Sequence, residues 1–170
     1  MRVVAARLGV TSVVRTHCIP EQGRDTKAGI ASAADGPLMV LLSAELPDGG
    51  RAVFGGITSV AVSVPASGLE FFTDARAALV SVQCPGRLGE GVQLAMVEAG
   101  QAEEAVYCIE KGGMAFGLDI QITPELEVYS DYPWHYTGVS SYRDMLVGDR
   151  NHGKWLNIAV LEFFSLTYSD

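Results

Sequence analysis

Residues 156–168, which read LNIAVLEFFSLTY, decide the fold of this chain. Their apolar side chains recur at every second position, which is the period of a β-strand packed on both faces. Glu162 shares the register of Ile158 and Phe164. A bare buried carboxylate costs on the order of several kcal/mol, so Glu162 must be paired, protonated or turned towards a cavity. The segment predicts a central strand that carries one anomalous acidic residue.

Glu162 allows two interpretations. As a structural residue, it is satisfied by an arginine or a tyrosine hydroxyl, or it lies at an exposed, frayed strand edge. As a functional residue, it faces the interior and serves as a general acid or base. We expect the interior position, because Leu156, Ile158 and Phe164 share its register.

Alternating or valine-rich stretches in the preceding chain predict further strands. These strands are expected over residues 2–16, 38–46, 51–64, 69–73, 78–83 and 114–122. The turn sequence PDGG at 47–50 joins the second and third of them into a hairpin, since glycine reaches positive φ at no steric cost. Gly55 and Gly56 predict a bulge or a close approach of two backbones. Residues 21–35 have little strand character and are expected to form a surface excursion.

Residues 92–111 are compatible with two structures. Their alternation favours a hairpin with a loop at 98–104, which we expect. Their alanine and glutamate content before Gly112 is instead typical of a helix that ends at a glycine.

The segment 123–154 has few aliphatic runs and many tyrosines, which predicts a long connection with one short helix at 140–147. About ten strands with regular turns predict a single domain over residues 1–170. The expected fold class is all-β, or β-dominated α+β, and the architecture is an antiparallel β-barrel or a two-sheet sandwich.

Composition limits the partners that this chain can have. Hydrophobic residues make up 48% and charged residues 19% of its 170 residues, and its mean hydropathy is +0.21. Such a chain has apolar surface to line a cavity or to bury against a partner. The formal charge of −8 repels phosphate backbones, so nucleic acid is not an expected partner. No apolar run reaches the about 18 residues of a membrane helix, so a membrane is not expected either.

The cysteines and the first residues predict a compartment. Cys18, Cys84 and Cys108 are odd in number and widely spaced, with no Cys-x-x-Cys pair. We therefore expect three free thiols in a reducing environment. Arg7 interrupts the apolar stretch that a secretory signal needs, which predicts a cytoplasmic protein or a chain already trimmed.

The candidate site residues come from the aromatic connection and the last strand. His135 is flanked by aromatic residues, which either stack on a ligand or anchor the connection to the sheet. We expect His135 and Glu162 to be catalytic, because either residue type can move a proton. The expected ligand-binding residues are Tyr132, Trp134, Tyr136, Arg143 and His152. The sequence has no metal-ligand spacing, nucleophile elbow or phosphate loop, so neither a metal nor a cofactor is expected.

These features predict a hydrophobic small molecule as the partner, bound inside or at the mouth of the β structure. The enzyme version is metal-free acid/base chemistry of the isomerase, cyclase or lyase type on an apolar substrate. Alternatively, the apolar β surface forms a homo-oligomer, and the chain is a structural or interaction protein. A third and weaker interpretation is binding to a membrane surface through the tyrosine-rich connection.

Overall fold

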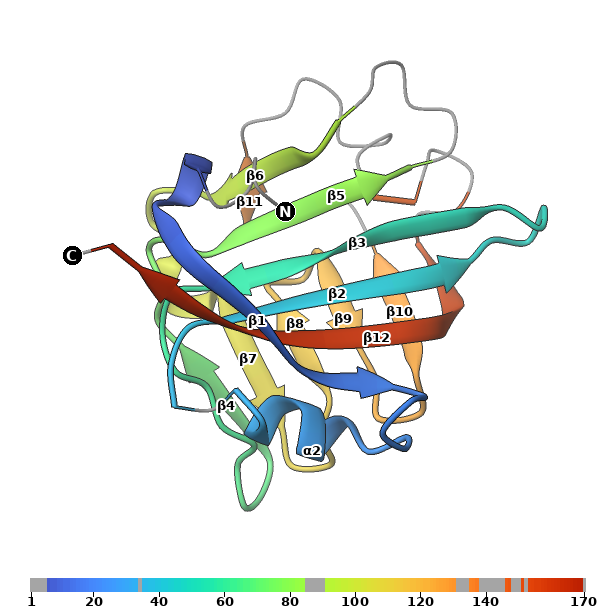
Figure 1. Cartoon of the computed structure of the whole chain (residues 1–170), viewed down its shortest axis with the longest axis horizontal. Helices are drawn as coiled ribbons and strands as arrows, with labels where there is room; N and C mark the ends of the chain where they lie inside the picture. The colour runs from blue at the N-terminus through green and yellow to red at the C-terminus, as the bar shows by residue number, and fades with distance from the viewer. Residues whose placement is uncertain are drawn as a thin grey trace.

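The computed structural model describes residues 6–33, 35–84, 91–130, 135–137, 146–147, 151 and 153–169, and Figure 1 shows their arrangement. Twelve strands dominate it and all pair antiparallel, which confirms the predicted β-dominated class. The strands are β1 (Val10–Ile19), β2 (Leu38–Glu45), β3 (Arg51–Thr58), β4 (Leu69–Phe72), β5 (Ala78–Gln83), β6 (Gln93–Val97), β7 (Val106–Ile109), β8 (Met114–Phe116), β9 (Ile120–Ile122), β10 (Glu127–Ser130), β11 (Tyr136–Thr137) and β12 (Lys154–Tyr168). Helix α2 spans Thr26–Ala31, and the 3-10 helix η1 spans Ala102–Glu104.

The strands form one continuous sheet that folds over into two layers (Figure 1). Their hydrogen-bonded order is β11-β6-β5-β3-β2-β12-β10-β9-β8-β7-β4, and β1 pairs with β12. We call β1, β2, β3, β5, β6 and β11 the front layer, and β4, β7, β8, β9 and β10 the rear layer. Among the described residues, the end strands β11 and β4 do not pair with each other, so the sheet is not closed into a barrel.

The long strand β12 belongs to both layers. Residues 154–157 pair with β10 of the rear layer, whereas 158–165 pair with β2 and 161–168 pair with β1. A register shift lies between Ile158 and Val160. Because an extra residue bends a strand and increases its twist, β12 passes from one layer to the other at this bulge.

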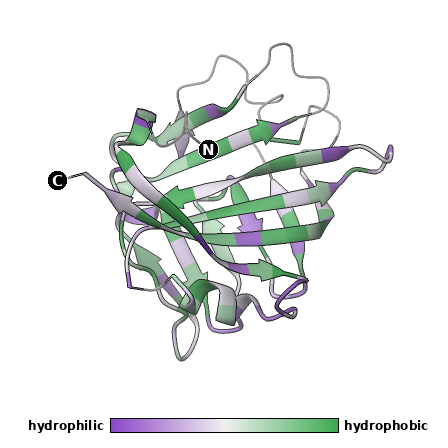
Figure 2. Cartoon of the chain, viewed as in Figure 1, coloured by the Kyte–Doolittle hydropathy of each residue, from purple (hydrophilic) through white to green (hydrophobic). Residues whose placement is uncertain are grey.

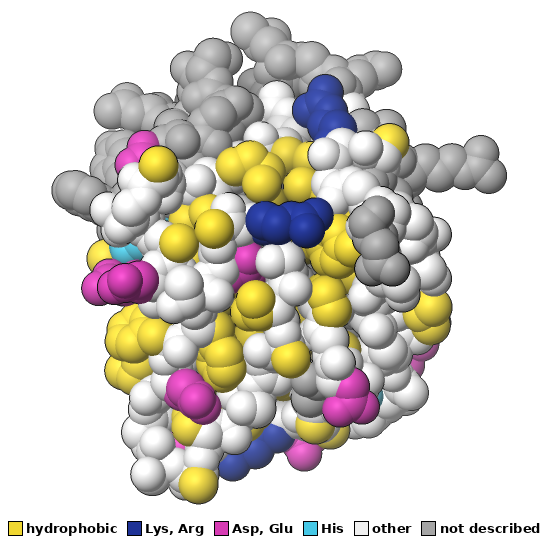
Figure 3. Space-filling model, turned by 90° about the vertical axis from the view of Figure 1, so that its left-hand side faces the viewer, with side chains coloured by type: hydrophobic (Ala, Val, Ile, Leu, Met, Phe, Trp, Pro, Cys, Tyr) yellow, Lys and Arg dark blue, Asp and Glu magenta, His cyan; other side chains and the backbone are white. Residues whose placement is uncertain are grey.

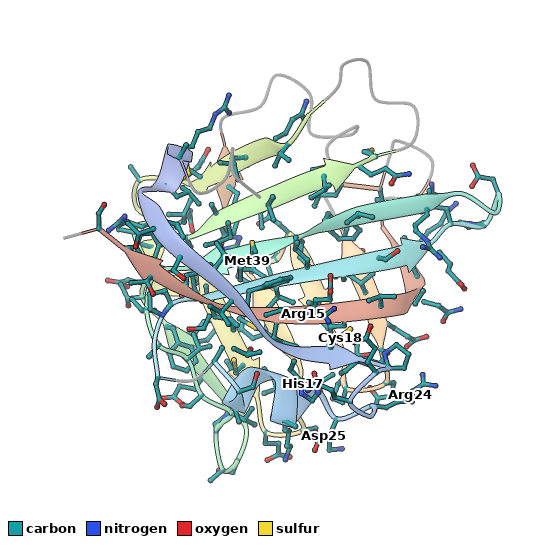
Figure 4. The ribbon with its side chains drawn as sticks, in the orientation of Figure 1. Arg15, His17, Cys18, Arg24, Asp25 and Met39 are labelled. Atoms are coloured by element: carbon teal, nitrogen blue, oxygen red, sulfur yellow. The ribbon has the colours of Figure 1, made fainter. Side chains whose placement is uncertain are left out.

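The same bulge determines the face on which Glu162 lies. Ile158 before it, and Leu161 and Phe163 after it, belong to the core between the layers. Glu162 therefore lies on the opposite, outer face, where its side chain is 29% exposed. Its Oε1 accepts a hydrogen bond of 2.9 Å from Nη1 of Arg15, which lies on β1 beside β12 (Figure 4). The expected interior position is wrong, and the alternative in which an arginine satisfies the carboxylate is confirmed.

Two glycines of β3 let neighbouring groups approach closely. A Cβ at Gly56 would lie 2.4 Å from the ring of Phe116, so this glycine lets the front layer pack on the rear layer. A Cβ at Gly55 would lie 1.8 Å from the carbonyl oxygen of Val40 on β2. The predicted close approach at this pair is confirmed.

Strand β2 is buried on both faces, which explains its nearly continuous apolar sequence. Val40 and Leu42 belong to the core between the layers. Met39 and Leu41 belong to a second cluster on the outer face, against which Val13 of β1 also packs. Figure 2 shows the corresponding hydrophobic colouring along the front strands.

The predicted hairpin at 92–111 is half right. Both strands exist, as β6 and β7, but β6 pairs with β5 and β11 of the front layer. In contrast, β7 pairs with β4 and β8 of the rear layer. The connection crosses from one layer to the other and is held by a hydrogen bond of 2.8 Å from Asp74 N to Ala102 O. The pairing predicted for the hairpin is therefore wrong.

The single strand predicted at 114–122 is two strands. Gly117 has φ +55°, a left-handed conformation that favours glycine. It opens a three-residue turn, after which β9 pairs back on β8 with Phe116 opposite Ile120. Alternation continues on both sides of the turn, which is why the sequence pattern conceals it.

The surface excursion predicted at 21–35 contains helix α2. Asp25 is its N-cap, and Oδ1 accepts hydrogen bonds from Lys27 N at 2.9 Å and Ala28 N at 3.3 Å. Figure 4 labels Asp25 at the start of the helix. A cap of this kind satisfies amide groups that have no partner within the helix.

Other expectations have mixed outcomes. The helix expected at 140–147 lies outside the described residues except for Leu146 and Val147, which are both buried. None of the three cysteines is in a disulfide, as predicted, and all three are buried. In the described part of the chain, no helix has the length and apolar character needed to cross a membrane.

Candidate functional site

The turn between β8 and β9 supports His135, which immediately precedes β11. A Cβ at Gly117 would lie 2.7 Å from Cβ of His135, so the glycine allows the imidazole to pack against the turn. The backbone of His135 is fixed on both sides. Its carbonyl accepts a hydrogen bond of 2.7 Å from Glu98 N, and its N–H donates to Oδ2 of Asp119 at 3.2 Å.

The imidazole of His135 lies between two carboxylates. Nδ1 is 3.4 Å from Oδ2 of Asp119, which is fully buried. Nε2 is 3.5 Å from Oε2 of Glu104, whose side chain is 64% exposed. Nδ1 also accepts a hydrogen bond of 3.2 Å from the backbone N–H of Leu118. In the neutral ring this contact assigns the proton to Nε2, which faces Glu104.

His135 opens into a pocket of about 200 Å³ on the outer side of the rear layer. Leu69, Phe71, Tyr107 and Leu118 supply most of its wall. The rings of Phe71 and Tyr107 meet edge to face, with centroids 5.5 Å apart and planes at 61°. Buried polar atoms and an apolar wall thus meet in one concavity, which is the usual composition of a ligand site.

A second depression of about 280 Å³ adjoins the first, since Leu69 and Tyr107 line both. It extends across β8 and β9, past Gln121, to Trp155 at the start of β12. There the rings of Trp155 and Tyr129 lie 5.2 Å apart. We call the two adjoining depressions the rear trough.

Large apolar side chains along the rear trough are exposed. Leu69, Phe71, Leu118 and Trp155 each leave about half of their surface accessible. Figure 3 views the side of the molecule on which β4 and β7 lie, and it shows hydrophobic side chains gathered there. A gathering of exposed apolar side chains is typical of an interaction site, because isolated exposed apolar residues are common but clusters are not.

The structure separates the two predicted catalytic residues. His135 opens into the rear trough, whereas Glu162 lies on the outer face of the front layer in an ion pair with Arg15. Tyr136, expected to shape the pocket, is fully buried, and its hydroxyl donates to the carbonyl of Ala105 at 2.5 Å. Tyr136 lines neither depression of the rear trough, so His135 and Tyr136 do not share one site. Burial, followed by the charges of Asp119 and Asp74, raises the pKa of Tyr136 well above its ordinary value.

The remaining predicted site residues, Tyr132, Trp134, Arg143 and His152, lie outside the described residues.

Several residues in or beside the rear trough were not identified from the sequence. Glu104 was part of an expected loop, and Asp119 of the polar face of an expected strand. The signal for a turn was present in the order Gly117, Leu118, Asp119, since glycine and aspartate are both common in turns. Phe71 and Tyr107 come from different strands, and no local pattern indicates that they meet.

In the part of the chain that the structure describes, no group of three or more His, Cys, Asp or Glu side chains is arranged to hold a metal ion. No protein-family model matches this chain, and no curated protein matches its sequence. A functional assignment therefore rests on the geometry of the rear trough.

Proposed function

We propose that this protein binds a hydrophobic small molecule in the rear trough. The observation that carries the proposal is the gathering of three half-exposed large apolar side chains, Leu69, Phe71 and Leu118, around the buried His135, with Trp155 in the adjoining depression. Each depression alone is smaller than the about 300–1,000 Å³ of a typical ligand site, but together they reach that size. The apolar body of the ligand lies along Leu69 and Tyr107, and a polar group of the ligand lies beside Glu104 and His135.

The position of His135 supports a second candidate function, acid/base catalysis on the bound ligand. Glu104 and Asp119 flank the imidazole at 3.5 and 3.4 Å. A histidine held between carboxylates in an apolar wall is suited to proton transfer, as in isomerase, cyclase or lyase reactions. In that case His135→Gln abolishes turnover of a ligand but leaves its affinity nearly unchanged, because Gln retains a hydrogen-bond donor without the ability to exchange a proton.

The test uses N-phenyl-1-naphthylamine, a neutral fluorophore whose emission rises in apolar surroundings. We expect saturable binding to the wild-type protein. Phe71→Ser should weaken it about tenfold, since removing the ring loses roughly 1.5 kcal/mol of apolar contact. Val14→Ser is the matched control, because Val14 is 56% exposed and Phe71 52%. Val14 lies on β1 of the front layer, so this change should leave binding intact.

Two results would contradict the proposal. The first is fluorophore emission that rises without saturation. The second is an equal loss of fluorophore affinity in Phe71→Ser and Val14→Ser. Light scattering identifies the rival function, a homo-oligomer that covers the same apolar surface. A wild-type oligomer that Phe71→Ser dissociates, while Val14→Ser does not, would show that the trough is a subunit interface.

A further inference from the structure

The ionisable residues that line the rear trough point to the charge of its ligand. Glu104, His135 and Tyr107 are the ionisable residues among those that line its two depressions, and no described lining residue is Lys or Arg. We propose that the trough selects an organic cation, with an ammonium group carried on an apolar body. This inference rests on the proposed ligand binding in the trough and specifies the ligand's class.

Two carboxylates flank the imidazole of His135 at the polar end of the trough. Oε2 of Glu104 lies at the entrance, 3.5 Å from Nε2 of His135, and Asp119 lies buried behind the ring. With both carboxylates ionised, the three groups together stay negative whether the imidazole is neutral or protonated. A cation placed beside Glu104 is therefore attracted, and an anion is repelled.

Aromatic rings complete the expected seat for a cation. The rings of Phe71 and Tyr107 line the same pocket as Glu104. The face of an aromatic ring carries partial negative charge and attracts an ammonium group within about 6 Å of its centroid. Burial raises the pKa of the Tyr107 phenol, so the ring contributes its face and a neutral hydroxyl.

The same contacts predict an order of preference. A neutral ligand keeps the apolar contacts along Leu69 and leaves Glu104, which is largely exposed, hydrated by water. An ammonium ligand adds the attraction of Glu104 and the rings, worth about three- to tenfold in affinity for partly exposed groups. A carboxylate ligand meets repulsion from Glu104. The expected order is cation, then neutral molecule, then anion.

The experiment displaces N-phenyl-1-naphthylamine with three probes of equal chain length, octylammonium, 1-octanol and octanoate, at pH 7 and low salt. Octylammonium should displace the fluorophore at a concentration about three- to tenfold below that of 1-octanol, and octanoate should be the weakest. In Glu104→Gln, this advantage over 1-octanol should shrink towards one. Glu103→Gln is the matched control, since Glu103 is an exposed neighbour on η1 that does not line the trough. Raising the salt concentration should reduce the advantage in the wild type.

The outcomes separate this inference from the proposed function. If the fluorophore binds but octylammonium displaces it no better than 1-octanol does, the choice of a cation is wrong and the ligand site stands. An advantage that survives Glu104→Gln, or falls equally in Glu103→Gln, also overturns the inference. If the fluorophore itself does not saturate, both proposals fail together.

Discussion

At the scale of single residues, Cys108 shows how the core controls a titratable group. It lies on β7, fully buried between the layers. Burial, and to a smaller extent the charge of Glu70, raises the pKa of its thiol from 9.0 to about 12. The cause is desolvation, because a thiolate in an apolar core has no water to stabilise it.

This shift predicts a loss of stability in alkali. Above pH 9 the thiol of the unfolded chain ionises, while that of the folded chain stays protonated until about pH 12. Because the pKa is raised on folding, the contribution is fully present below pH 9 and disappears as the pH rises towards 12. In urea unfolding experiments, the free energy of unfolding of the wild-type protein should fall from pH 8 to pH 11. In Cys108→Ala this fall should be smaller by about 2–3 kcal/mol at pH 11. The prediction would be contradicted if the free energy of unfolding depended on pH in the same way in the wild type and in Cys108→Ala.

Tyr136 permits a second residue-scale prediction. Its hydroxyl donates to the carbonyl of Ala105, which also accepts a hydrogen bond of 2.8 Å from Gly117 N. Tyr136→Phe therefore leaves no buried acceptor unpaired, and it should cost about 1 kcal/mol of unfolding free energy. Fluorophore binding should be unchanged, since the side chain is buried away from the trough. Weakened binding at unchanged stability would restore Tyr136 as a ligand contact.

At the scale of elements, the packing of the two layers depends on glycine in β3. Gly56 stands where any side chain would meet the ring of Phe116 at 2.4 Å. The interior is close-packed, so the ring has little room to move away. The layers approach each other at this position because a residue without Cβ occupies it.

Gly56→Ala should therefore destabilise the protein by about 1–3 kcal/mol, the ordinary cost of overpacking a core. Gly36→Ala is the control, because a Cβ there meets nothing within 4 Å. That substitution should change stability by less than about 0.5 kcal/mol. The midpoints of urea unfolding, compared at constant m-value, measure the change in stability of both variants. Equal midpoints for the two variants would show that the layers can move apart at β3 to accommodate a side chain at position 56.

The element scale also shows where sequence patterns are sufficient. Alternation identifies β12 and the strands on either side of Gly117, because inward and outward side chains repeat with period two in any strand. It cannot identify the bulge between Ile158 and Val160, since both residues are apolar and either register looks continuous. Glu162 was misplaced for this reason. Alternation does not identify the turn at Gly117 either, because a short hairpin can preserve the alternation of a single strand.

At the scale of the whole molecule, β12 links the two layers through its strand pairings. It pairs with β10 at one end and with β1 and β2 at the other. Unfolding either layer breaks pairings of this strand and exposes the core between the layers. Independent unfolding of one layer is therefore unfavourable.

We expect one two-state transition. Far-ultraviolet circular dichroism reports on all strands, and tryptophan fluorescence includes Trp155 on the rear side. Their urea unfolding curves should coincide within error, with a single midpoint. Separated midpoints would mean that the layers unfold one after the other.

The sequence by itself determined the class of this protein: antiparallel strands, a turn at 47–50, three cysteines without a disulfide and an apolar surplus. These properties depend on local periodicity, turn chemistry and composition, which need no knowledge of distant residues. Tertiary structure alone decided which strands pair and which side chains share a site. Val10 lies opposite Tyr168, and His135 meets Glu104 from η1 and Asp119 from a turn. Such neighbours come together only when the sheet folds over on itself, because register and layer assignment depend on packing between segments far apart in the chain.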